Sequence, residues 1–181
     1  ILSYNVNDAG AISTQIITIT NLSDKKQAYQ LSLGDWLRDS IGGHKYFSSG
    51  AISRTCSPWI SFDNALIEIE PQKSREVRVT LKAPADPKAT NEMKWAMIFI
   101  QNVMEQTGDE NKGGKMKATI REVYRIGVHV YQTPSVATEK QAKAISVVPN
   151  KLEKNVYDFS MNNTGKAMLE CKVRAVLTNL A

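Results

Sequence analysis

Few residues of this sequence are of the types that bind metal ions or act in catalysis, and their spacing is not that of a metal site or an active site. The two histidines are His44, in a Gly-Gly-His-Lys segment, and His129, which alternates with apolar residues. The two cysteines, Cys56 and Cys171, stand far apart. A structural zinc ion takes four such ligands at short, paired spacings. These residues therefore predict no metal site, and no cofactor is expected.

The groupings that catalysis requires are also missing from the sequence. There is no Gly-x-Ser-x-Gly segment, the turn that exposes a nucleophilic serine in many hydrolases. Acid–base work needs two carboxyl groups held together, whereas five aspartates stand singly in expected turns: Asp35, Asp39, Asp63, Asp86 and Asp109. We therefore predict that the chain is not an enzyme.

Charge and hydropathy exclude two further classes of function. The chain has 23 basic and 18 acidic residues, a net charge of +5. The basic residues are scattered, whereas a nucleic-acid binder gathers them on one face or in one run. No apolar run approaches the roughly 18 to 20 residues of a membrane-spanning helix. The partners are therefore expected to be proteins, and the sequence does not indicate an oligomeric state.

The dominant pattern is an alternation of apolar and polar residues with a period of two, interrupted by turns. This pattern is typical of an all-β sandwich. It predicts about seven strands in residues 1–134, which is close to one immunoglobulin-like domain. The stretch 40–50, rich in Gly and Ser, is expected to connect two of them. The strands are expected near residues 17–20, 29–33, 59–62, 67–70, 77–81, 95–103 and 120–131.

A second unit is expected after a linker at residues 135–141. Its strands would lie near 144–148, 156–161 and 169–177. The turn at 162–166 repeats the turn at 21–25, since both place Asn and Gly or Asp between alternating runs. Residues 142–181 are too few for a sandwich of about 100 residues. They predict a partial second immunoglobulin-like domain.

The segment 59–84, with 18–21 before it and 131–134 after it, resembles the PapD-like periplasmic pilus-assembly chaperones. It shows their order of strand, Pro71-x-x-Ser74, strand and Ala83-Pro84. The resemblance implies two immunoglobulin-like domains, a location in the periplasm or at the cell surface, and a signal peptide already removed. Family members hold a partner's terminal carboxylate with an Arg and a Lys. Here the first strand has no Arg, and the Lys position falls on or near His129.

Together with this resemblance, the sequence predicts a non-catalytic, extracytoplasmic, chaperone-like protein that binds surface or secreted proteins or helps to assemble them. Partners would pair with an exposed edge strand that ends the first domain. We expect this strand to carry the site, at Tyr124, Ile126, Val128, His129 and Val130. The alternative for this apolar row is that it fills the sandwich core. Two alternative functions remain open, namely a structural or adhesive module of a larger cell-surface protein and a cytosolic adaptor like the major sperm proteins.

Overall fold

The computed structural model describes residues 1–39, 41–103, 124–174 and 176, and these residues form strands and short turns. The predicted strand start at residues 120–123 and part of the predicted strand 169–177 lie outside the described residues. The strands are β1 (Leu2–Tyr4), β2 (Ile12–Thr20), β3 (Gln27–Arg38), β4 (His44–Ser48), β5 (Ile60–Phe62), β6 (Leu66–Ile69), β7 (Ser74–Lys82), β8 (Lys94–Asn102), β9 (Arg125–Gln132), β10 (Ala142–Pro149) and β11 (Tyr157–Asn163). Two single 3-10 turns, η1 (Ser57–Trp59) and η2 (Pro87–Thr90), join β4 to β5 and β7 to β8.

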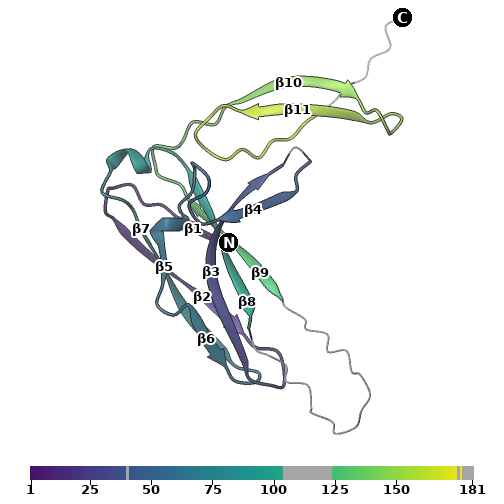
Figure 1. Cartoon of the computed structure of the whole chain (residues 1–181). Helices are drawn as coiled ribbons and strands as arrows, with labels where there is room; N and C mark the ends of the chain where they lie inside the picture. The colour runs from purple at the N-terminus through teal and green to yellow at the C-terminus, as the bar shows by residue number, and fades with distance from the viewer. Residues whose placement is uncertain (40, 104–123, 175, 177–181) are drawn as a thin grey trace, which may run out of the picture.

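Strands β1 to β9 form two sheets packed face to face. The larger sheet has the order β1-β9-β8-β3-β4, and β6 also pairs with β3. The smaller sheet has the order β2-β7-β5. The hairpin β10-β11 lies apart from both sheets, beyond β4 (Figure 1). The predicted all-β, immunoglobulin-like sandwich is confirmed.

The core forms where the inward side chains of the two sheets meet. On β7, Val77, Val79 and Leu81 have no exposed surface, while the residues between them face outward. Burial of one such side chain contributes about 1.5 to 3 kcal/mol, so the alternation is what drives the two sheets together. Strand β8 is apolar on both faces because it lies inside the larger sheet, between β3 and β9.

Strand β1 closes one side of the sandwich and ties it to β9. The Tyr4 hydroxyl donates a 2.7 Å hydrogen bond to the carbonyl oxygen of Val79 in the opposite sheet. Burial raises the pKa of Tyr4 to about 12. At the end of β9, the fully buried amide of Gln132 accepts from the Val6 N–H at 3.0 Å and donates to the Val6 carbonyl. One side chain thus satisfies both polar groups of a buried residue.

The two turns that resemble each other in the sequence have the same pattern of side-chain hydrogen bonds. The Asn21 side chain accepts from the Ser23 N–H at 3.0 Å and donates to the Lys25 carbonyl at 2.7 Å. The Asn163 side chain accepts from the N–H two residues on, at 3.0 Å, and donates to the carbonyl four residues on, at 2.8 Å. Each asparagine therefore ends its strand, β2 or β11, by the same local mechanism.

The structure differs from the sequence-based expectation in two places. Strand β4 lies inside the stretch 40–50 that was expected to be a connection, and all five of its side chains are exposed. No strand is present at residues 169–174, within the third strand expected for the second unit. The described residues also contain no helix long and apolar enough to cross a membrane.

Candidate functional site

Strand β9 has one side that is only partly covered. Its partner on one side is β8, with Lys94 opposite Gln132 and Gln101 opposite Arg125. The hydrogen bond from the Asn102 N–H to the Tyr124 carbonyl, at 3.1 Å, extends this ladder by one residue pair. It shows which residues of β9 are hydrogen-bonded to β8. In an antiparallel pair the hydrogen-bonded residues alternate. The even-numbered residues of β9 therefore face β8, and the odd-numbered ones direct their N–H and C=O groups to the other side.

Strand β1 covers only the end of that other side. It pairs in parallel with residues 130–132, and the Thr133 N–H donates to the Tyr4 carbonyl at 2.8 Å. In the stretch before residue 130, the backbone N–H and C=O groups that point away from β8 are those of Arg125, Gly127 and His129. Among the residues that the structure describes, no strand pairs with them. An open edge of this kind can take up a further strand.

The predicted apolar row changes from core to surface along β9. Val130 is fully buried and belongs to the core, which is the alternative that the sequence left open for the row. Val128 is half-buried and packs against that core. Ile126 has 62% of its surface exposed, and Tyr124, just before the strand, has 63%. A partner strand can therefore meet Ile126 and Val128, and not Val130.

The opposite face of β9 carries an aromatic cluster that the sequence did not predict. Its buried members are Trp36, Met97 and Phe99, which lie on the outer face of the larger sheet. The Arg125 guanidinium lies 3.9 Å above the centre of the Phe99 ring. Gly127 leaves room for Met97, because a Cβ atom there would stand 2.9 Å from the sulfur. The strand thus has one face for the core and one for this cluster.

His129 belongs to this cluster, on the opposite face from the apolar row. Its ring centre lies 4.6 Å from that of Trp36 and 5.4 Å from that of His44. In the described part of the chain, its buried Nε2 atom has no hydrogen-bond partner. Burial lowers the pKa of His129, and the charges of His44 and Arg38 lower it further. The ring is therefore neutral at pH 7 and does not replace a lysine.

A cleft of about 770 Å³ separates the aromatic cluster from the segment after β11. Trp36, Trp95 and Tyr131 line it on the side of the sandwich, and Met161 and Leu169 line it on the other. The cleft touches β9 only through Tyr131, which lies in the part of the strand that β1 covers.

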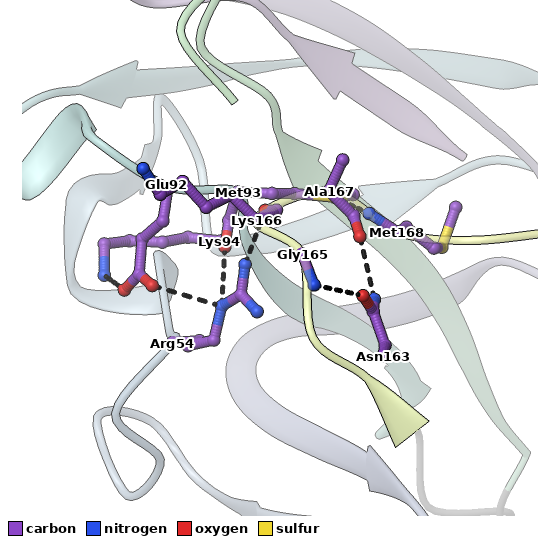
Figure 2. A network of polar contacts seen from close by, with 9 residues as sticks. All are labelled: Arg54, Glu92, Met93, Lys94, Asn163, Gly165, Lys166, Ala167 and Met168. Carbon is purple, nitrogen blue, oxygen red and sulfur yellow. Dashed lines mark hydrogen bonds and ion pairs between the residues drawn. The ribbon is translucent and has the colours of Figure 1, made fainter. Parts of the chain in front are cut away.

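Arg54 fixes the two walls of the cleft relative to each other (Figure 2). Its guanidinium donates to the Met93 carbonyl at 3.1 Å and to the Lys166 carbonyl at 2.7 Å. It also lies 3.5 Å from a carboxylate oxygen of Glu92. The same side chain stacks over the ring of Trp95, with 5.2 Å between guanidinium carbon and ring centre. Arg54 thus joins the sandwich to the segment after β11.

Two further reactive groups are buried: Cys56 in the core, and Asp35 in hydrogen bonds that hold a loop. Burial raises the pKa of Cys56 to about 12, which leaves it a neutral thiol. The fully buried Asp35 accepts four hydrogen bonds from the loop 51–57. Within residues 1–39, 41–103, 124–174 and 176, no three His, Cys, Asp or Glu side chains gather where they could hold a metal ion.

Neither the known protein families nor the curated proteins contain a match to the sequence. Solved structures do match. The CsuC–CsuE chaperone–subunit complex of Acinetobacter baumannii pili aligns with a TM-score of 0.53 at 9% identity, over 91% of this chain and 68% of the matched chain. The fimbrial chaperone CfaA aligns with a TM-score of 0.52 at 8% identity, over 91% of this chain and 64% of the other. The fold is PapD-like.

The Escherichia coli chaperone DraB is also similar, with a TM-score of 0.47 at 12% identity over 77% of this chain. The chain spans 54% to 68% of the length of these three chaperone chains. At such identities the likeness concerns the fold alone. Within this PapD-like fold, the open edge of β9, the exposed Ile126 and the adjoining cleft are properties of this chain's own residues.

Proposed function

We propose that this PapD-like chain is a non-catalytic, chaperone-like protein that binds an extended segment of another protein along the edge of β9. The open N–H and C=O groups of Arg125, Gly127 and His129 carry the proposal. A partner strand would pair with them in the position that β1 occupies further along. Each hydrogen bond gained contributes about 0.5 to 1.5 kcal/mol, so three residues supply a moderate share of the affinity.

Specificity would come from the side chains that alternate with these backbone groups. Ile126 is exposed next to the open edge, and its burial contributes about 1.5 to 3 kcal/mol. The partner is expected to present an apolar groove or an apolar strand that covers Ile126 and Val128.

We further propose that partners are secreted or surface subunits and that the protein acts in the periplasm or at the cell surface. The likeness in fold to periplasmic chaperones supports this location. Residues 142–181 are proposed to belong to a second immunoglobulin-like domain, after a linker at 135–141. The shared turn geometry of Asn21 and Asn163 supports this division, because it equates β11 with β2.

The proposal is tested by the binding of extended peptides to the full chain. The probe is a fluorescent panel of peptides with alternating apolar and polar residues, acetylated and amidated so that no free carboxylate is present. We expect Ile126→Asp to weaken binding at least tenfold. Leu66→Asp is the matched control, since Leu66 on β6 is 63% exposed and lies on another strand. Equal binding by both variants and the wild type would contradict the proposal.

A further inference from the structure

Strand β2 forms a second open edge, in the smaller sheet. It pairs with β7 over all nine residues without a break in register. Hydrogen bonds from the Ala83 N–H to the Ala11 carbonyl and from the Asn21 N–H to the Lys73 carbonyl, both 2.9 Å, flank this pairing. They show that odd-numbered residues face β7. The N–H and C=O groups of residues 12, 14, 16, 18 and 20 therefore point away from the sheet.

Nothing in the described part of the chain covers this edge. No strand pairs with the outer side of β2. Strand β1 contacts β2 at Gln15, whose side chain donates to the Ser3 carbonyl at 2.5 Å. Gln15 alternates with the outward-facing residues, so this contact lies on the core side and leaves the backbone edge open.

The edge also lacks the features that usually prevent strands from pairing. Proteins protect open edges with charged residues, prolines, bulges or short strands. Residues 12–20 contain no charged residue and no proline, although 23% of the chain is charged. Three other edge strands are protected in these ways, because β1 and β5 have three residues each and β4 carries Lys45. An uncharged edge of nine residues is suited to pairing.

The pattern of β2 is complementary to itself. A second copy, related by a two-fold axis at Ile16, would pair Ile16 with Ile16, Thr14 with Thr18 and Ile12 with Thr20. All of these positions have outward-pointing backbone groups, so each becomes a hydrogen-bonded pair. The residue on the two-fold axis meets its own copy, so a charged side chain there would repel itself, whereas Ile16 does not.

We propose that the chain forms a symmetric dimer through antiparallel pairing of β2 with β2 of a second copy. The two small sheets then join into one continuous sheet. Ile16, which is 52% exposed, gains an apolar neighbour across the axis, its own copy, and Ile12, which is 63% exposed, lies opposite Thr20. Hydroxyl pairs on this face already link β2 to β7, between Thr14 and Thr80 at 2.9 Å and between Thr20 and Ser74 at 2.8 Å. The dimer extends this row of threonines.

Cross-linking by an engineered disulfide tests the register. Residue 16 would face its own copy, with about 5.5 Å between Cα atoms, which is within reach of a disulfide. We expect Ile16→Cys, made together with Cys171→Ser, to form a covalent dimer on mild oxidation. Thr14→Cys in the same background is the control. Its two copies would lie about 13 Å apart along the strands, too far to bridge.

Sedimentation analysis tests the association itself. The wild type should be in a monomer–dimer equilibrium that depends on concentration. Ile16→Lys should be monomeric, because two ammonium groups would meet at the axis, and Leu66→Lys should behave like the wild type. A wild type that stays monomeric at all concentrations overturns the proposal, as does equal cross-linking through residues 14 and 16. Both outcomes are independent of peptide binding at β9.

Discussion

The guanidinium of Arg54 donates a hydrogen bond of 2.7 Å to the Lys166 carbonyl, 112 residues away along the chain. This bond joins the first sandwich to the segment after β11. We expect Arg54→Ala to free that segment while leaving the sandwich folded. Amide exchange at residues 163–168 should rise by about tenfold, the equivalent of about 1.4 kcal/mol for one lost charge-assisted bond. Mass spectrometry of exchanged peptides measures it.

Arg54→Lys is the control for this prediction. Lysine keeps the positive charge near Glu92 but lacks the planar fork that reaches both carbonyl groups. Its effect on exchange should therefore fall between those of the wild type and Arg54→Ala. Unchanged exchange in both variants would show that Arg54 does not hold the two parts together.

Asp35 should be essential for stability. Its carboxylate is fully buried and accepts from the Ala51 N–H at 2.7 Å, the Thr55 hydroxyl at 2.5 Å and the Ser57 hydroxyl at 2.7 Å. Asp35→Asn places an NH₂ group against these donors. We expect it to lower the free energy of unfolding by about 2 to 4 kcal/mol in a urea titration.

The matched control is Asp63→Asn. Asp63 is exposed and accepts from the N–H groups of Asn64 and Arg78, at 2.9 and 3.0 Å. Because water can replace these bonds, the control should change stability by less than about 1 kcal/mol. A loss at Asp35 no larger than at Asp63 would contradict the role given to the buried carboxylate.

His129 should make the protein less stable in mild acid. Burial and the positive charges of His44 and Arg38 lower its pKa in the folded state from the ordinary 6.5. Between the lowered pKa and 6.5 the unfolded chain binds more protons, so stability falls as pH falls through this window. His129→Gln should flatten the dependence of the melting temperature on pH between about 7.5 and 5. If the melting temperature of the variant depended more steeply on pH, the pKa of His129 would be raised in the folded state, and the prediction would be wrong.

In β9 the N–H groups of successive residues point alternately to the open edge and to β8. Proline substitutions at two successive residues should therefore have different effects on peptide binding and stability. Arg125→Pro removes an N–H that points away from β8, so it should weaken peptide binding and leave most of the stability. Ile126→Pro removes an N–H that faces β8 and should cost about 1 to 3 kcal/mol of stability, because a carbonyl group of β8 loses its partner. Arg125→Gln is the control, because it loses the contact with the Phe99 ring and keeps the N–H. Thermal unfolding and peptide binding of the three variants measure both effects.

The alternation in the sequence located the core strands because those strands have one face inside. The predicted strand 77–81 is confirmed within β7, whose inward residues are fully buried. Strand β4 was missed because none of its residues is buried, so it shows no alternation. Periodicity reports burial on a face, and an exposed strand leaves no such signal.

The sequence also did not show which side chains meet across the larger sheet. It placed Ile126 and Val128 on one row, but it could not show that Val130 lies in the core and Ile126 at the surface. Nor could it bring His44 to His129, which are joined only through the pairing of β4, β3, β8 and β9. Such contacts depend on register between distant strands, and a single sequence does not specify that register.

Strand β1 divides β9 into two parts. Its residues occupy the β9 positions 130–132 and are locked there by Tyr4 and by the Gln132 amide. A guest strand cannot pair with these positions unless it displaces β1, because the backbone groups that it would need are already bonded. Val130 is also fully buried in the core, so this part of β9 offers a guest no side chain. The choice of ligand therefore falls to the exposed Ile126 and its neighbours, which can be changed without disturbing the part of β9 that holds the sandwich together.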